Sequence, residues 1–177
     1  MKSINVIDLD KTLIDFDSFR YLVIDELKSL NLKIALLVIV RRLRLIDASR
    51  FKKGVIETLK LDSNSRLNSK MADLIVSSID KKVLEKIEKE SSATTINILC
   101  SASANSYVKE VAKRLGWVGY GSYIDENNLF YHMYGANKLK FIESKYPNSK
   151  YRYNFAISDS KSDLEMLKRF ERYEIVF

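Results

Sequence analysis

The sequence predicts an α/β fold in which a parallel sheet with covering helices carries an inserted helical unit. Strand and helix patterns alternate from about residue 94 onward, which is typical of a parallel sheet with right-handed crossovers. An apolar run at residues 4–10 predicts one further strand. Residues 17–90, which follow it, show only helical patterning, with no proline and one glycine. That stretch is far too long for one crossover, so we interpret it as an insertion.

Composition narrows the class of protein. The 177 residues, 46% of them hydrophobic, suit one globular domain with a modest insertion. The single cysteine, Cys100, excludes an internal disulfide, and the first residues show no secretory signal pattern, so we expect a cytoplasmic protein. The formal net charge of +7 suggests an anionic partner, which could be phosphate, nucleic acid or an acidic membrane surface.

The first strand ends in two carboxylates, Asp8 and Asp10. Residues two apart on a strand point to the same side, so both would stand at the strand's carboxyl end, where open α/β sheets bind ligands. Neighbouring carboxylates repel one another unless a cation lies between them or one is protonated. The alternative is an Asp-rich turn in which Asp10 or Thr12 caps a local structure.

The insertion starts just after these carboxylates. We expect its helices to break near Asn31, Asp47, Asp62 and Asp80. Placed there, it would lie over the strand ends as a cap. We therefore assign residues 1–16 and 91–177 to the α/β core and residues 17–90 to a helical cap.

The segment at residues 34–46 combines an apolar run with arginines. The run ends at Arg41 and is too short to span a bilayer, which needs about 20 apolar residues. We favour the interpretation that it forms the buried core of a small helical bundle, with its arginines on the solvated face. The alternative is peripheral contact with an anionic membrane surface, since residues 20–53 hold nine Lys or Arg against three Asp or Glu.

After the insertion the elements follow in a regular order. We expect strands at 94–101, 118–124, 129–134, 152–158 and 173–177, and helices at 104–115, 136–146 and 162–170.

Two polar residues lie near the ends of these expected elements. Ser101 ends the strand at 94–101, where its hydroxyl and the free N–H groups of the next helix would hold a phosphate oxygen. Lys138 lies in the first turn of its helix, where the helix dipole disfavours a cation unless an anionic site compensates. The alternatives are that Ser101 or Ser103 only caps a helix and that Lys138 is solvated.

The stretch SDSKSD at residues 158–163 adds two more carboxylates. Asp159 ends an apolar strand, and Asp163 falls in the first turn of the next helix, so both could reach one cation. The alternative is an ordinary helix cap. Four carboxylates on one sheet edge describe a site for a hard divalent ion, and Mg²⁺ is the usual one where phosphate is the substrate.

The order of these motifs resembles the haloacid dehalogenase superfamily of phosphohydrolases. DLDKTLIDFDSF, ILCSAS, the YGANK segment and SDSKSDLEML are similar to the four motifs of its phosphoserine-phosphatase-like branch. The resemblance covers nearly the whole chain apart from the inserted helices. It implies a Rossmann-like parallel sheet core with an inserted helical cap, and a hydrolase.

The resemblance also implies a role for each site residue. Asp8 would be the nucleophile that forms an aspartyl-phosphate, and Asp10 the acid that protonates the leaving group and then the base that activates water. The phosphate would be bound by Thr12, which supports the loop, and by Ser101, Ala102 and Lys138. Mg²⁺ would bind the Asp8 carboxylate, the Asp10 backbone carbonyl and Asp159, with Asp163 a ligand or beside the ligands.

These implications predict a Mg²⁺-dependent phosphomonoester phosphatase acting on a small phosphorylated metabolite. A phosphotransferase, a phospholipid-head-group phosphatase at the membrane surface and a non-catalytic anion-binding protein are the alternatives. The cap would select the substrate, with Asp17 and Ser18 as candidates for its hinge and the substrate entrance; the alternative is that they cap a helix. We interpret His132 as structural, and the aromatic residues show no base-stacking pattern that would favour nucleic acid. The sequence does not predict the oligomeric state.

Overall fold

The computed structural model describes residues 2–176 and contains a six-stranded sheet with the order β4-β3-β2-β1-β5-β6. Its strands are β1 (Lys2–Ile7), β2 (Thr95–Ala104), β3 (Val118–Ile124), β4 (Phe130–Tyr131), β5 (Tyr151–Ser158) and β6 (Arg172–Ile175). All neighbours pair in parallel except β3 and β4. The predicted α/β fold is confirmed. The expected strand at 173–177 starts one residue earlier, and its last residue, Phe177, lies outside the described residues.

Five helices separate β1 from β2. They are α1 (Ser18–Lys28), α2 (Leu32–Arg42), α3 (Ala48–Leu59), α4 (Ser65–Ser77) and α5 (Lys81–Lys89). Each begins after an Asp or Asn whose side chain accepts a hydrogen bond from a backbone N–H of the first turn: Asp17, Asn31, Asp47, Asn64 and Asp80. Three of the four predicted breaks coincide with these caps, and the fourth falls two residues from Asn64.

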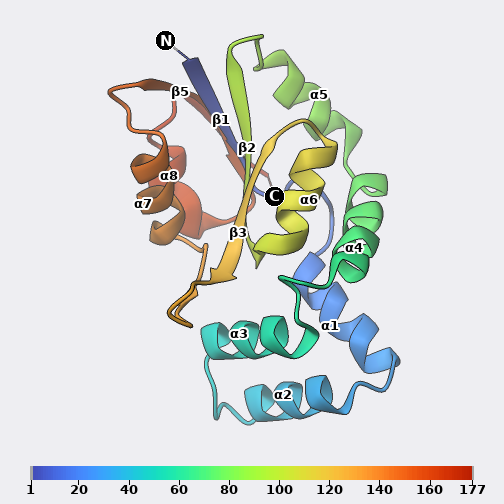
Figure 1. The fold of residues 1–177 in the computed structure, drawn as a ribbon. Coiled ribbons are helices and arrows are strands. Elements are labelled where there is room, and N and C mark those ends of the chain that lie inside the picture. Colours follow the sequence, from blue (N-terminus) through green and yellow to red (C-terminus); the bar gives the residue numbers. More distant parts are fainter. Residues whose placement is uncertain (1, 177) are drawn as a thin grey trace.

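Two hydrophobic layers cover the sheet (Figure 1). On one face α7 (Ala136–Lys145) and α8 (Leu164–Leu167) pack against strand residues such as Ile4 and Val6. On the other face α4, α5 and α6 (Asn105–Arg114) share a core with residues such as Leu99 and Ile157. Strands with both faces buried explain the nearly continuous apolar runs of the sequence.

Helices α1, α2 and α3 lie beyond the carboxyl ends of the strands, at the bottom of Figure 1. Helix α4, by contrast, packs along α6 beside the sheet. The carboxylates at the strand ends therefore face α1 to α3. The division of the chain at residue 90 into core and cap stays a prediction.

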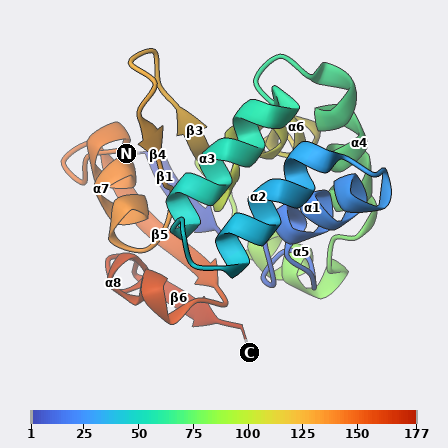
Figure 2. The same cartoon turned by 90° about the horizontal axis from the view of Figure 1, so that it is seen from below.

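The interpretation of residues 34–46 as buried core holds only for one side of α2, where Leu37 and Val38 pack against the hydrophobic core. Ile34 is the one buried residue of α2, whereas Leu36 and Ile39 are 62% and 54% exposed. The reason is tertiary: α2 packs on α1 and α3, and no other element of residues 2–176 covers its outer side (Figure 2). A separate question is whether any helix could cross a membrane. Within the described residues, no helix has the length and apolar character needed to cross a bilayer.

The helix expected at 162–170 is much shorter. A 3-10 turn at Lys161–Asp163 leads into α8, which ends at Leu167. The chain must leave the helix early because the Glu171 N–H already donates to the Tyr153 carbonyl of β5 at 3.0 Å, one residue before β6 begins.

Candidate active site

The carboxyl ends of the central strands and the inserted helices enclose a pocket of about 470 Å³. Seven of the eight predicted site residues line it: Asp8, Asp10, Ser101, Ala102, Lys138, Asp159 and Asp163. Seen along the strands in Figure 2, α2 and α3 lie in front of the sheet. The structure thus brings together residues that the sequence separates by more than 150 positions.

A buried ion cluster lies at the end of β1. The Lys138 Nζ donates to Asp8 Oδ1 at 2.7 Å and to Asp163 Oδ2 at 2.6 Å. Burial raises the pKa of Asp8 to about 7, Lys138 opposes this shift and Asp163 adds to it. Burial also lowers the pKa of Lys138, but the two carboxylates outweigh burial and raise it above its usual value. Lys138 therefore remains a cation, and it compensates the negative charge of the Asp8 carboxylate only in part.

Asp10 lies two residues after Asp8 and its carboxylate is held from two sides. Its Oδ1 accepts from the Ser18 N–H at 2.6 Å, and its Oδ2 accepts from the Ser103 hydroxyl at 2.6 Å and from the Ser101 hydroxyl at 3.2 Å. These bonds orient the side chain while its residue still lines the pocket. A carboxylate fixed in this way is suited to exchange a proton with a bound group.

Thr12 is the predicted site residue that does not line the pocket. It is buried, and its hydroxyl accepts the Asp159 N–H at 2.8 Å. This bond ties the loop after β1 to the loop after β5 and so positions Asp159 at the pocket. The arrangement agrees with the loop-supporting role that the resemblance implies.

The sequence analysis missed three contacts at this site. Ser103 binds Asp10; the expected strand ended at Ser101, but β2 continues to Ala104 and so includes Ser103. A longer strand would have placed both hydroxyls on one side, which is the signal that could have found this contact. Ser18, interpreted only as a cap hinge or helix cap, holds Asp10 with its N–H and bonds the buried Tyr107 hydroxyl at 3.2 Å. No local pattern indicates that Tyr107 reaches the site.

Lys52 and His132 also line the pocket. Lys52, from α3, donates to the Ala102 carbonyl at 2.8 Å, and burial lowers its pKa. His132, interpreted as structural, has a buried Nε2 without a hydrogen-bond partner in the described part of the chain. Burial lowers the pKa of His132 to about 4, so its ring is neutral near pH 7. Both residues come from elements distant in sequence, which is why spacing gave no signal.

The residues present fit a hard divalent cation. The expected ligands of Mg²⁺ are the carboxylates of Asp8 and Asp159 and the backbone carbonyl of Asp10, and all three residues line the pocket. Within residues 2–176 no three His, Cys, Asp or Glu side chains form a metal cluster, so the four carboxylates expected at this edge do not converge on one point. Asp163 is bound to Lys138 instead, and the set of two carboxylates and one carbonyl stays a prediction. The incompletely compensated charge of Asp8 would be stabilised by a cation.

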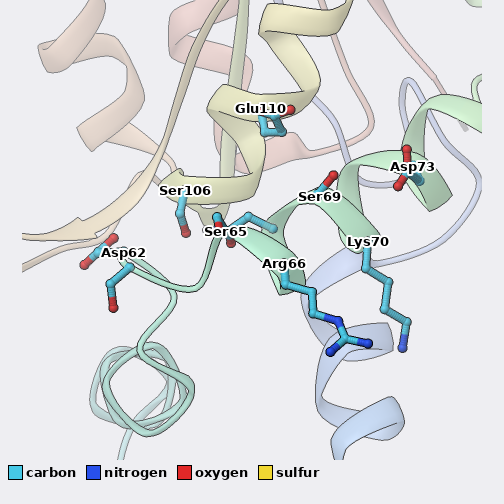
Figure 3. A pocket seen from close by; sticks show the side chains of 10 residues that line it. Asp62, Ser65, Arg66, Ser69, Lys70, Asp73, Ser106 and Glu110 are labelled. Carbon is cyan, nitrogen blue, oxygen red and sulfur yellow. The ribbon is translucent and has the colours of Figure 1, made fainter.

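Two other candidates for a functional site, Cys100 and a second pocket, do not offer a comparable set of reactive groups. Burial raises the pKa of the Cys100 thiol to about 12, so it is not a nucleophile near neutral pH. A larger pocket between α4 and α6, of about 870 Å³, is polar, and its Lys70 and Asp73 pair with Asp25 and Arg114. In Figure 3 the Arg66 and Lys70 side chains extend away from Glu110 instead of converging with it.

Comparison with known proteins identifies a family. A family model described as haloacid dehalogenase-like hydrolase matches residues 6–168, which is most of the chain. No curated protein sequence matches the chain.

Several solved structures share the fold. A protein of unknown function from Bordetella pertussis Tohama I has a TM-score of 0.72 at 13% identity, over 98% of this chain and 89% of that one. A phosphoserine phosphohydrolase-like protein from Francisella tularensis subsp. tularensis SCHU S4 has a TM-score of 0.58 at 15% identity, over 98% and 86%. A phospho-aspartyl intermediate analogue of phosphoserine phosphatase has a TM-score of 0.60 at 12% identity, over 97% and 85%. At these identities the likeness establishes a common fold.

Proposed function

The chain belongs to the haloacid dehalogenase-like hydrolase family, and from that premise we propose that it is a Mg²⁺-dependent phosphomonoester phosphatase. One observation carries the proposal: Asp8, at the end of the central strand, is buried against Lys138, and Asp10 follows two residues later with its carboxylate held in place. A nucleophile and an acid–base group are thereby provided in one pocket.

The Asp8 carboxylate performs the first displacement. One of its oxygens attacks phosphorus, the bond between phosphorus and the ester oxygen breaks, and an aspartyl-phosphate forms. Lys138, which bonds Asp8 and lines the pocket, compensates negative charge on both the nucleophile and the phosphoryl group. A phospho-aspartyl intermediate is also named for the phosphoserine phosphatase that shares this fold.

Asp10 moves the proton in both steps. In its protonated form it donates to the leaving alkoxide as the ester bond breaks. It then takes a proton from the water that attacks the aspartyl-phosphate, which releases inorganic phosphate and restores Asp8. The hydrogen bonds from Ser18 and Ser103 keep its carboxylate in one orientation for both transfers.

The remaining polar groups hold the phosphoryl oxygens. The Ser101 hydroxyl and the backbone around Ala102 lie at the end of β2, directly before α6. When bound by Asp8, Asp159 and the Asp10 carbonyl, Mg²⁺ would neutralise charge on the phosphoryl group. Thr12 and Asp163 position these groups through the Asp159 N–H and Lys138.

Hydrolysis of p-nitrophenyl phosphate, with and without Mg²⁺, tests the proposal. We expect Mg²⁺-dependent release of phosphate by the wild type and a fall to background for Asp8→Asn. Asp15→Asn, an exposed carboxylate on the same loop, is the matched control and should keep full activity. Turnover by Asp8→Asn close to that of the control would contradict the proposed nucleophile.

The same assay separates hydrolysis from phosphotransfer to an alcohol. Glycerol is added as a second acceptor, and p-nitrophenol and inorganic phosphate are measured together. Equal amounts of the two products support water as the acceptor. Phosphate that falls short of p-nitrophenol would show that the aspartyl-phosphate passes its group to the alcohol.

A further inference from the structure

The three helices beyond the strand ends enclose an apolar pocket of about 410 Å³. Arg20 lines it, but most of its lining consists of apolar side chains from α1, α2 and α3: Phe19, Val23, Ile24, Leu27, Val38 and Phe51. Phe19 and Val23 are buried, and Phe19 meets Phe51 edge-on with ring centroids 6.4 Å apart. The small helical unit therefore leaves room inside a largely hydrocarbon lining.

This apolar pocket adjoins the candidate active site. Asp17, Ala48 and Lys52 line both pockets. The Lys52 Nζ lies 5.1 Å from the Phe19 ring centroid and donates to the Ala102 carbonyl of the phosphate-binding segment. Lys52 thus contacts both the polar and the apolar pocket, and the two pockets adjoin at these three shared residues.

We propose that the substrate is a phosphorylated amphiphile: its phosphate binds at Asp8 and its hydrocarbon part enters the pocket between α1, α2 and α3. The inference rests on the proposed function, because the ester bond that breaks is the one between phosphorus and the alcohol that carries the hydrocarbon. The occupant is identified by the shared boundary of the two pockets and by the mainly apolar lining of the second one. A small polar leaving group would leave that wall in contact with water.

Binding of a series of n-alkylphosphonates tests the inference without requiring turnover. Methyl- to octylphosphonate are titrated into the wild-type protein in Mg²⁺ buffer and followed by calorimetry. We expect affinity to rise by about four-fold for each added methylene until the chain fills the pocket, the increment typical of a buried CH₂ group. Equal affinity from methyl to octyl would overturn the inference.

Two variants locate the effect. Val38→Phe fills the pocket, and Ile24→Asp places a charge on its rim, where the side chain is 40% exposed. Both should abolish the rise with chain length and leave methylphosphonate binding unchanged. Leu129→Asp, an apolar residue exposed on another loop, is the control. A chain-length effect that survives both variants would place the hydrocarbon elsewhere and overturn the inference.

Turnover of p-nitrophenyl phosphate in the same samples reports separately on the proposed function. If this ester is hydrolysed but the phosphonates show no chain-length effect, the phosphatase stands and the amphiphile inference is wrong. If the phosphonates bind as expected but no ester is hydrolysed, the apolar site stands and the proposed reaction is wrong.

A second observation concerns the outer side of α2. Leu32, Leu36, Ile39 and Leu43 follow one another at helical spacing and are 80%, 62%, 54% and 64% exposed. Five cations and no acidic residue lie within residues 28–46, and all five are exposed: Lys28, Lys33, Arg41, Arg42 and Arg44. Helix α2 is also the element farthest from the sheet in Figure 1.

From this stripe and its charges we infer that α2 lies on an anionic phospholipid surface. An apolar stripe flanked by these five cations matches hydrocarbon below and anionic head groups around it, as in interfacial amphipathic helices. The observation is independent of the apolar pocket, because the stripe points away from α3 whereas Val38 of the pocket wall faces inward.

Co-sedimentation with phosphatidylglycerol-containing vesicles tests this second inference. The full chain should bind them and not pure phosphatidylcholine vesicles, and Leu36→Asp with Ile39→Asp should reduce binding at least ten-fold. Arg41→Gln should reduce it about five-fold. Leu129→Asp again serves as the control.

Three results would overturn the membrane inference. The first is no binding to anionic vesicles at low salt. The second is binding that the two Asp substitutions leave unchanged. The third is a dimer in sedimentation velocity that these substitutions dissociate, which would assign the stripe to a second copy of this chain.

Discussion

Lys138 shows how one side chain determines the electrostatics of the site. Its ammonium lies between the buried carboxylates of Asp8 and Asp163, at 2.7 and 2.6 Å. A lone cation in the first turn of a helix is disfavoured by the helix dipole, but here two anions outweigh that cost. The unusual position of Lys138 is explained by Asp8, which follows β1, and by Asp163, which follows β5.

Replacing this lysine should therefore destabilise the protein as well as inactivate it. Lys138→Met leaves two like-charged carboxylates buried without a partner, and we expect a loss of about 3–5 kcal/mol in the free energy of unfolding by urea. Lys140→Met, exposed on the same helix, should change it by less than about 0.5 kcal/mol. Equal stability of the two variants would contradict the ion cluster.

His132 makes stability depend on pH. Burial, with a smaller effect from Lys52, lowers the pKa of this histidine from 6.5 to about 4 in the folded state. Between these values the unfolded chain binds the proton and the folded chain does not, so stability rises with pH in that window and is lost as pH falls below 6.5. Urea unfolding at pH 7.5 and pH 5 measures the effect.

The matched variant for this prediction is His132→Phe, which cannot take up the proton. We expect the wild type to lose about 1 kcal/mol more than the variant between the two pH values, a modest figure because the ring is only half-buried and solvent screens its charge. The same pH dependence in both proteins would assign it to other groups.

At the scale of elements, β3 and the start of α6 approach too closely for a side chain. A Cβ added at Gly121 would lie 2.6 Å from the Ser103 carbonyl and 2.7 Å from the Asn105 nitrogen. The Gly121 N–H also donates to the Asn105 side chain at 3.0 Å. This contact holds Ser103 in the position from which its hydroxyl binds Asp10.

We expect Gly121→Ala to lower the free energy of unfolding by about 2–3 kcal/mol, since the backbone of β2 or α6 must move. It should also lower kcat, because Ser103 moves with that backbone. Gly116→Ala is the control: its Cβ meets nothing within 4 Å, and its φ of +71° costs only about 1 kcal/mol. Thermal unfolding and turnover measured on both variants separate the two effects.

At the scale of the whole molecule, a cation at the strand ends should link β1, β5 and their loops. Binding of Mg²⁺ to the folded state alone stabilises it by about 2.7 kcal/mol at a concentration of 100 times Kd. For a chain of this size that corresponds to a rise in Tm of roughly 5–10 °C. The measurement is thermal unfolding with Mg²⁺, against NaCl at equal ionic strength.

Asp159→Asn should remove most of this stabilisation, because it removes one of the two expected carboxylate ligands. Asp62→Asn, an exposed acid in the separate polar pocket, should keep it. A Tm that rises equally in both variants would mean that the ion binds elsewhere.

The sequence by itself determined the order of elements and most of the site. Helix starts can be predicted from sequence because a capping residue bonds a backbone N–H only two or three residues away. Asp17, Asn31, Asp47 and Asp80 therefore indicate where their helices begin. Asp8, Ser101 and Asp159 were readable because parallel strands bring their carboxyl ends to one edge.

Only the tertiary structure decided which surfaces are covered and which distant groups meet. The apolar sequence of α2 does not indicate whether its outer side is buried or exposed. The packing of the neighbouring helices decides this, and it leaves Leu36 and Ile39 exposed. Lys52 reaches Ala102, and Tyr107 reaches Ser18, through contacts between segments at least 50 residues apart. Burial and such contacts depend on the arrangement of whole elements, and no local pattern of residues encodes that arrangement.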